Sequence, residues 1–438
     1  MSEYVSAGGA EPQPPIATKS VADIYIDERQ EVLADLSGGT VPDLETVEAC
    51  TLRRMVEAGV PLATAADRAA TSFIQHGYQG ASAEAVVRRL VADYRVQQLM
   101  ATALDMGQLF ERDEPPLDYV VPGFMVGTYG LLVGAGGGCK STWAALAAMS
   151  VASGRNLLGM LPGNQDTGEP FRVGQGCATF LNLEDHARPL RMRMQMMLRA
   201  RRDGGQGDFY IPERDRAEII RASQAGELFI LPRPRDVLQP FAVDQNGKVV
   251  KTSDYAVFEG LCARSRLLIC DTMNILISSA GIDENSNTHM GPAAAALNRT
   301  AEETDCAILI PHHPPKVDVV NGTTDSGGRG ASAIGDNSRF RLSLRGMTTT
   351  EGKERWPNLE GHELDRMRRA WVHAEWSKTS YSEMPYPVWL RRSGVLLEGV
   401  PDDLVPKPVP KPAAASSQGS VVDIGSALGR PGIPGGRR

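Results

Sequence analysis

A glycine-rich segment between an apolar run and a helix-forming run constrains the fold of this chain more than any other feature. The apolar run YGLLV is followed by GAGGGCKS at 134–141, and STWAALAAMSVASG continues from Ser141 to Gly154. Glycines allow consecutive backbone N–H groups to turn inward around a phosphate chain, and the first turn of a helix adds partial positive charge. The order of strand, glycine-rich loop and helix predicts a phosphate-binding loop of the GxxxxGK[ST] type.

Such a loop predicts ATP as the ligand and Mg²⁺ as its metal. We expect Lys140 to reach the β- and γ-phosphates and Ser141 to hold Mg²⁺ through its hydroxyl. Cys139 stands where the pattern has glycine, so we expect altered nucleotide geometry or slower hydrolysis. The alternative is a glycine-rich turn that merely begins a helix, which we expect to end at a Gly154 cap. The residues predicted to contact the nucleotide are Gly134, Gly136, Gly137, Gly138, Cys139, Lys140, Ser141 and Thr142.

Two apolar runs end in acidic residues that suit ATP hydrolysis. Asp271 ends the run LLICD, a Walker B pattern that places a carboxylate at the end of a strand, near Mg²⁺. Glu184 closes the run at 178–183, 184 − 140 = 44 residues after Lys140. We expect that strand to lie beside the phosphate-loop strand, so that Glu184 faces the γ-phosphate as general base. The alternatives are an ordinary turn aspartate and an acid that begins a helix.

Histidines and an arginine follow later strands. His312 and His313 come directly after AILIP, and we expect His313 to sense the γ-phosphate. The alternative is a pair of partly buried histidines satisfied by the backbone. Arg339 precedes another strand, and we predict that it acts across a subunit boundary as an arginine finger that stabilises the transferred phosphoryl group.

Two further groups of basic residues are candidates for binding phosphates. The loop at 317–334 is rich in glycine and polar residues, and Arg329 within it, with Lys316 before it, suits contact with a single nucleic-acid strand. The alternative is a solvent-exposed loop. Arg188, Arg191 and Arg193 follow Glu184 and lie either near the nucleotide or on a solvated helix face.

The pattern of apolar runs predicts an α/β fold, and the glycine-rich loop places it in the P-loop class. Apolar runs of four to seven residues alternate with helical segments, which indicates a mostly parallel central sheet. Strands near 339–345, 370–377 and 388–399 alternate in a two-residue period and predict antiparallel edge strands. We expect a flexible arm at 1–41, a small helical domain at 42–110, the ATPase domain at 111–400 and a disordered tail at 401–438.

Composition narrows the class of protein further. Hydrophobic residues make up 42% of the 438 residues and charged residues 23%, as in ordinary soluble proteins. No run approaches the roughly 18 apolar residues of a membrane span, so we expect no membrane partner. The six cysteines have no metal-ligand spacing and suit a reducing cytoplasm. The net charge of −7 argues against a wholly basic surface, but not against nucleic acid in a locally basic channel.

Several segments together resemble the RepA-type hexameric helicases of mobilisable plasmids, within the superfamily of RecA, DnaB and KaiC. They span roughly 115–400, and their order and spacing match as well as their residues. The segments are PPLDYVVP, GTYGLLVGAGGGCKS, FLNLEDHARP, SRLLICDT, DCAILIPHH, GRGASAIGDNSRF and WSKTSYS.

This resemblance implies a ring of identical subunits, a hexamer, that hydrolyses ATP between subunits and translocates on single-stranded DNA in a phage or plasmid replication system. A primase or initiator is then the expected partner of residues 42–110. Two other functions stay open: a RecA- or KaiC-like ATPase that remodels nucleoprotein without unwinding, and a weakly hydrolysing assembly platform. Matched to the family's motifs, the catalytic residues are Lys140, Glu184, Asp271, His313 and Arg339, with Arg193 at the nucleotide and Ser141 and Asp271 at the metal.

Overall fold

The chain divides into two compact units, residues 1–115 and 116–438, in the computed structural model. The structure describes residues 19–36, 42–163, 169–200, 210–236, 238–278, 281–313, 332–382, 385–401 and 404–408. Most of the predicted arm and tail therefore lies outside the described residues, as does most of the loop at 317–334.

The first unit is helical and is held together around a buried carboxylate. Glu48 is 0% exposed and accepts hydrogen bonds from the Tyr25 hydroxyl at 3.0 Å, the Arg29 Nε at 2.9 Å and the Ser72 hydroxyl at 2.8 Å. A buried carboxylate needs such partners, because burial removes its hydration. Tyr25 and Arg29 belong to a helix within the predicted flexible arm, so ordered structure begins earlier than that expectation. The helices are α1 Val21–Leu36, α2 Leu44–Glu57, α3 Leu62–Gln75, α4 Gly80–Ala101 and α5 Met106–Glu111.

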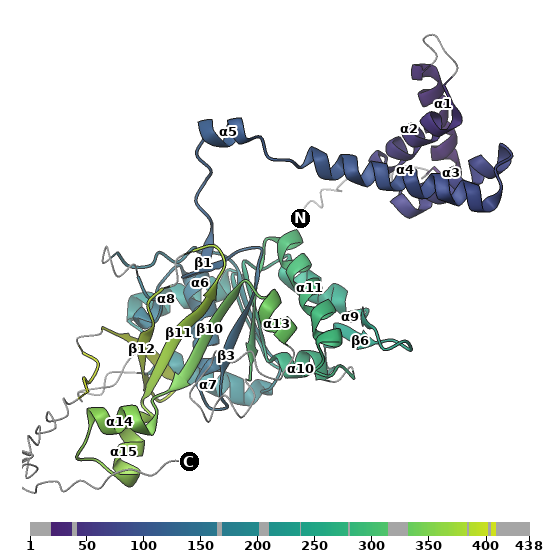
Figure 1. Cartoon of the computed structure of the whole chain (residues 1–438). Helices are drawn as coiled ribbons and strands as arrows, with labels where there is room; N and C mark the ends of the chain where they lie inside the picture. The colour runs from purple at the N-terminus through teal and green to yellow at the C-terminus, as the bar shows by residue number, and fades with distance from the viewer. Residues whose placement is uncertain are drawn as a thin grey trace, which may run out of the picture. The chain divides into compact units, whose positions relative to one another are not determined.

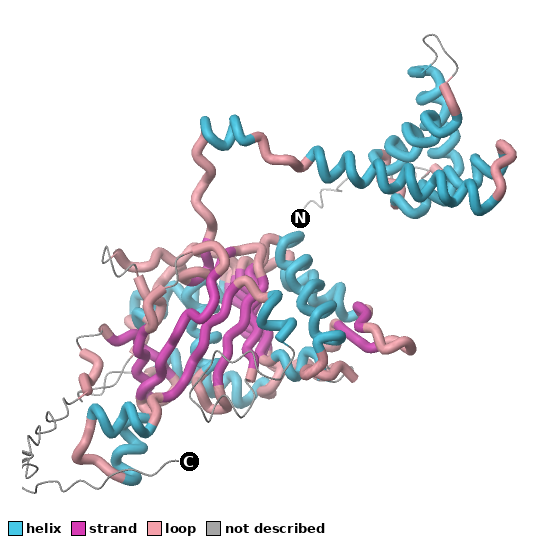
Figure 2. The backbone as a smooth tube through the Cα atoms, viewed as in Figure 1, coloured by secondary structure: helices cyan, strands magenta, loops and turns pink. Residues whose placement is uncertain are grey.

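The second unit is built on a nine-stranded sheet, shown in magenta in Figure 2. Its strand order is β13-β12-β11-β10-β3-β9-β8-β4-β5. Two small antiparallel pairs, β1–β2 and β6–β7, lie outside it. The strands are β1 Tyr119–Val121, β2 Phe124–Met125, β3 Tyr129–Gly134, β4 Ala178–Asn182, β5 Leu228–Leu231, β6 Phe241–Val243, β7 Val249–Lys251, β8 Leu267–Asp271, β9 Ala307–His312, β10 Phe340–Gly346, β11 Trp371–Thr379, β12 Val388–Ser393 and β13 Leu396–Val400.

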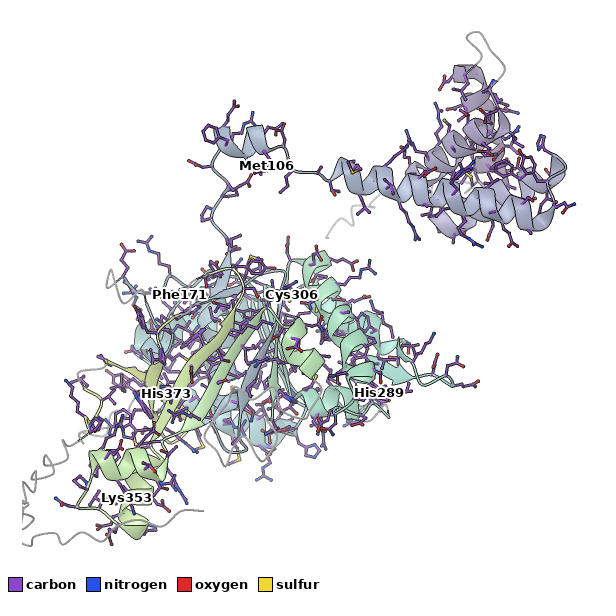
Figure 3. All side chains as sticks on the ribbon, in the orientation of Figure 1. Met106, Phe171, His289, Cys306, Lys353 and His373 are labelled. Atoms are coloured by element: carbon purple, nitrogen blue, oxygen red, sulfur yellow. The ribbon has the colours of Figure 1, made fainter. Side chains whose placement is uncertain are left out.

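Helices cover both faces of this sheet. Alternate residues of a strand point to opposite faces: Leu132 and Leu309 pack in one core with α6 and α8, whereas Leu131 and Ile308 pack in a second core with α9 and α11. The two pairs of helices lie on opposite sides in Figure 1, and side chains fill the space between layers in Figure 3. The helices are α6 Lys140–Ser153, α7 Ala187–Arg199, α8 Glu213–Gln224, α9 Asp254–Cys262, α10 Met273–Ser278, α11 Asn287–Thr304, α13 Ser332–Asn337, α14 Thr349–Arg355 and α15 Gly361–Arg368, with a 3₁₀ turn at Leu157–Gly159.

This architecture confirms the predicted fold class: an α/β fold with a mostly parallel sheet, antiparallel edge strands and a helical region before it. The antiparallel part is smaller than expected, because β10 pairs in parallel with β3 and the antiparallel strands begin at β11. The prediction that the strand ending near Glu184 lies beside the phosphate-loop strand is wrong. Strands β9 and β8 lie between β3 and β4, and their apolar residues pack in both cores of the domain.

Strand direction places four strand ends at one edge of the sheet. Strands β3, β9, β8 and β4 are parallel to their neighbours, so their carboxyl ends lie together. In open α/β sheets, ligands bind at this edge, where the loops that follow the strands form a crevice. Among the described helices, none has the length and apolar character that crossing a membrane demands.

Candidate nucleotide-binding site

The glycine-rich loop joins β3 to α6, as the sequence predicts. Helix α6 begins at Lys140 and ends at Ser153, and Gly154 caps it with a φ of 66°. Cys139, at the helix N-cap, has a φ of 67° and a ψ of 15°, in the left-handed region. This conformation costs an L-residue with a side chain roughly 1–2 kcal/mol, whereas glycine adopts it readily. The backbone thus explains why the pattern has glycine here, and it shows that cysteine is accommodated with strain.

Lys140 is folded back onto the loop. Its side-chain amine donates to the carbonyl oxygens of Gly134 at 2.6 Å and Ala135 at 3.1 Å, and lies 3.1 Å from Nδ1 of His313. Burial lowers the pKa of Lys140, while the nearby carboxylates of Asp271 and Glu184 oppose that shift. The ammonium therefore has local partners that phosphate oxygens can replace when a nucleotide enters.

Asp271 presents a buried carboxylate at the end of β8. It is 0% exposed, and neither of its oxygens has a hydrogen-bond partner among the described residues. Burial raises its pKa to about 6, and the adjacent Ser141 hydroxyl opposes this shift although its geometry falls short of a hydrogen bond. An unpaired buried carboxylate is costly unless a cation joins it. The Asp271 carboxylate and the Ser141 hydroxyl are the oxygen donors that Mg²⁺ uses together with substrate phosphates, so these residues fit that ion.

Glu184 lies in the turn after β4, where Asn182 sets the backbone. The Asn182 side-chain oxygen accepts hydrogen bonds from the backbone N–H groups of Glu184 at 3.0 Å and Asp185 at 2.6 Å. Asp185 in turn forms an ion pair with Arg193 of α7 at 2.9 Å. The turn leaves the Glu184 side chain exposed toward the same cavity as Asp271, and it ties α7 to the end of β4.

A single cavity of about 390 Å³ unites these groups. Although β4 lies three strands from β3, the cavity brings Glu184 to Lys140 and Asp271. It also receives His313, whose pKa is lowered by burial and by the charge of Lys140. The cavity is lined by Gly137, Gly138, Cys139, Lys140, Ser141, Thr142, Glu184, Arg193, Asp271, Thr272, His313, Arg392, Gly394 and Val395.

Arg339 lies elsewhere. It is exposed and directly precedes β10, and its N–H donates to the carbonyl of Tyr129, the first residue of β3. Leu344 is the residue of β10 that pairs with Gly134. Arg339 is therefore five residues, or about 17 Å at ~3.3 Å per residue, from the strand level at which the phosphate loop begins. The structure does not bring Arg339 into the cavity of its own chain.

Among the other basic candidates, Arg193 lines this cavity, whereas Arg188 and Arg191 do not. Arg188 and Arg191 line a second cavity of about 590 Å³ along α7, together with Arg199. His312 faces inward beside His313, and burial lowers its pKa to about 4. Lys316 and Arg329 lie outside the described residues, and so does most of the loop at 317–334 that was expected to contact nucleic acid.

A family model described as an AAA domain matches residues 95–319, which is 225 of the 438 residues. The chain belongs to this AAA domain family. The match contains the phosphate loop, Glu184, Asp271 and His313, and stops before Arg339. This AAA domain is a P-loop ATPase domain, with ATP and Mg²⁺ as the expected ligands of the cavity.

The AAA domain also has a distant likeness to a solved structure. A KaiC-like protein from the hyperthermophilic archaeon Pyrococcus horikoshii is 15% identical, with a TM-score of 0.37. The match covers 65% of this chain and 100% of that one. At such a score the likeness bears on neither substrate nor partner.

Besides Thr272, which directly follows Asp271, sequence reasoning missed three residues that line the cavity of this AAA domain: Arg392, Gly394 and Val395. They come from the turn between β12 and β13, about 250 residues after the phosphate loop. The sequence pattern predicted a single strand near 388–399, whereas the structure has β12 and β13 there with a turn between them. The one available signal was the number of strand reversals, which decides the edge at which a turn emerges.

Proposed function

We propose that this AAA domain protein is an ATP-dependent DNA helicase of the RepA type. In this proposal a ring of identical subunits, a hexamer, hydrolyses ATP at subunit interfaces and translocates on single-stranded DNA. The observation that carries the proposal is the separation of Arg339 from the cavity of its own chain, because a motor with a shared site needs an arginine that points away from its own phosphate loop.

The residues of the cavity divide the work of hydrolysis. Lys140 leaves the carbonyls of Gly134 and Ala135 and binds the β- and γ-phosphates of ATP. Glu184 accepts a proton from the water that attacks the γ-phosphorus, while the bond from that phosphorus to the bridging oxygen of ADP breaks. Ser141 and Asp271 would hold Mg²⁺, which supplies positive charge to the phosphate oxygens.

Arg339 completes the site from the next subunit. Developing negative charge on the transferred phosphoryl group is stabilised by a guanidinium, and this contribution is typically large. A head-to-tail contact between identical subunits brings one edge of a subunit against the opposite edge of its neighbour. Such a contact would carry Arg339, at the amino end of β10, toward the carboxyl edge of the adjacent sheet.

A weakly hydrolysing assembly platform is the second candidate, and the strained backbone of Cys139 favours it. The strain of roughly 1–2 kcal/mol is smaller than the contribution of even one well-placed charged group to a transition state. With Lys140, Glu184 and Asp271 around one cavity, slower turnover is a better expectation than none. Remodelling of nucleoprotein without unwinding is a third outcome, which the experiment below distinguishes.

The decisive experiment mixes two inactive variants. Lys140→Ala removes the phosphate-loop lysine, and Arg339→Ala removes the arginine, so each homogeneous ring should lose ATP turnover. In a ring with random 1:1 mixing, about one interface in four pairs an intact Lys140 with an intact Arg339. ATPase activity should therefore return to roughly a quarter of the wild-type rate. Arg299→Ala, at an exposed site on α11 with 74% side-chain exposure, is the control and should keep full activity.

Strand displacement on forked DNA then separates the candidates. A helicase displaces the strand only with ATP and is stimulated by single-stranded DNA. ATP turnover without displacement would favour a remodelling ATPase. Nucleotide binding with no turnover, restored by Cys139→Gly, would establish the platform. Failure of the mixed variants to recover any activity would contradict the shared site.

A further inference from the structure

The turn between β12 and β13 reaches the phosphate loop because of strand direction. Strand β11 is antiparallel to β10, and β12 is antiparallel to β11. Two reversals restore the original direction, so β12 runs the same way as β10, which is parallel to β3. The carboxyl end of β12 therefore lies at the same edge of the sheet as the phosphate loop, and the turn at 393–395 emerges there.

This turn is well supported. Leu396 and Leu397, the first residues of β13, are 1% and 0% exposed and pack in the core that contains α6. Gly394 forms the turn with a φ of 56°, which glycine adopts without strain. Farther along β13, a Cβ built on Gly399 would lie 1.9 Å from the carbonyl oxygen of Gly159, so β13 packs directly against the 3₁₀ turn that follows α6. The turn is thus part of the packed domain.

Arg392, near the end of β12 and beside this turn, lines the nucleotide cavity. Its backbone N–H donates to the Ala370 carbonyl at 2.6 Å, and its Nε lies 3.3 Å from the Gly394 carbonyl. Within the described part of the chain no carboxylate forms an ion pair with it. Its guanidinium lies beside the Cys139 thiol and opposes the rise in the pKa of that thiol that burial causes.

Arg392 and the carboxylates occupy opposite sides of the phosphate loop. Glu184 and Asp271 follow β4 and β8, which lie beyond β9 on one side of β3. Arg392 comes from β12, beyond β10 and β11 on the other side. In the proposed reaction the γ-phosphate lies beside Glu184 and Asp271, so the rest of a bound nucleotide would extend away from them, past Thr142, toward the β12–β13 turn.

We propose that Arg392 binds the α- and β-phosphates of the nucleotide held by the phosphate loop of the same chain, and that the turn at 393–395 forms the wall beside the nucleoside. The proposal rests on nucleotide binding by this cavity and not on ring assembly or DNA. It gives the cavity a cation from each direction: Lys140 from the loop and Arg392 from the far edge of the sheet. A second phosphate-binding cation, Arg392, would also support nucleotide binding by a phosphate loop in which Cys139 replaces glycine.

The test measures binding of MgADP and of magnesium pyrophosphate by titration calorimetry, with the full chain. Arg392→Ala should raise the Kd for both ligands about ten- to hundred-fold, the effect of losing a charge-assisted hydrogen bond. Arg392→Lys should recover part of the affinity, because it keeps the charge without the bidentate geometry. Arg391→Ala is the matched control: it is the preceding arginine of the same strand, on the opposite face of the sheet, and should change the Kd less than about two-fold.

Each outcome decides a different point. An unchanged Kd for MgADP in Arg392→Ala, with a weakened Kd in Lys140→Ala, would overturn the role of Arg392 while leaving the nucleotide site in place. Weaker MgADP with unchanged pyrophosphate would overturn the assignment to phosphates. A wild-type protein that binds no nucleotide would overturn this proposal and the proposed ATPase together. Should Arg392→Ala fail to fold, judged by its thermal unfolding, Arg392→Gln replaces it with the same expectations.

Discussion

The Lys140 side chain lies 3.1 Å from Nδ1 of His313, although 173 residues separate them in the chain. The Lys140 ammonium can only donate hydrogen bonds, so Nδ1 of His313 must be the acceptor. This requires a histidine without a proton on that nitrogen. Burial and the adjacent positive charge of Lys140 both lower the pKa of His313 and keep it neutral. The pair exists because β9 is the direct neighbour of β3.

This pair predicts that His313 influences turnover through Lys140. Replacing His313 with alanine removes an acceptor that holds the lysine, and we expect kcat to fall about ten- to hundred-fold, with a smaller change in KM. Steady-state ATPase assays check this. His313→Asn, which retains an acceptor, should lose less activity than His313→Ala. Equal loss in both variants would contradict a role for the hydrogen bond.

Asp271→Asn should stabilise the metal-free protein and abolish turnover. Burial raises the pKa of Asp271 to about 6 from 3.8. Between these two pH values the carboxyl group is protonated in the folded state and ionised in the unfolded state. Protonated Asp271 contributes its full stabilisation to the folded state below pH ~4. This contribution is lost as the pH rises through ~6, which lowers the free energy of unfolding by up to about 3 kcal/mol. Thermal unfolding with chelator should therefore show a raised Tm for the variant at pH 7.5 and little difference at pH 4. A lowered Tm at pH 7.5 would show that the carboxylate has a partner in the free protein.

The lowered pKa values of two partly buried histidines predict that the protein loses stability in weak acid. Burial lowers the pKa of His312 and that of His373 to about 4, and nearby positive charges act in the same direction. An unfolded histidine binds its proton near pH 6.5, so stability is present above that pH and is lost as the pH falls toward ~4. Urea unfolding from pH 7 to pH 4.5 should show this decline, and His373→Gln should reduce its slope. His362→Gln, at an exposed position of α15, is the control.

Cys139→Gly should relieve the strained backbone of the phosphate loop. Glycine adopts a φ of 67° freely, so we expect the free energy of unfolding to rise by on the order of 1 kcal/mol and kcat to increase. Denaturant unfolding and ATPase assays measure the two effects. Cys177→Gly, away from the cavity, should not raise kcat. A lower kcat in Cys139→Gly would indicate that the thiol itself contributes to the site.

MgADP should protect Cys139 from alkylation. The thiol is partly exposed and lines the cavity, so bound nucleotide would restrict a maleimide from reaching it. Peptide mass spectrometry with and without MgADP measures the modification of each cysteine. Cys50 and Cys177 are also partly exposed and serve as internal controls whose labelling should not change.

Much of the candidate site could be predicted from local sequence patterns. The strand at 267–271 has the bounds of the apolar run LLICD, because a short apolar run that ends in turn residues has few ways to be buried. The glycine pattern located the phosphate loop and the cap at Gly154, and it singled out position 139, where the backbone is left-handed. Each of these features depends on neighbours within a few residues.

Long-range packing settled the rest. Nothing near Glu184 reveals that β8 and β9 come between β4 and β3, because strand order depends on which helix faces bury together after every strand has formed. Nothing near Arg392 reveals that two reversals bring its turn to the nucleotide edge. Residue type and spacing specify the chemistry of a local motif, whereas strand order and direction specify which distant side chains share its cavity. The chemistry of a local motif follows from backbone geometry over one turn or strand. The choice of distant side chains in its cavity follows from burial of apolar surface across the whole domain.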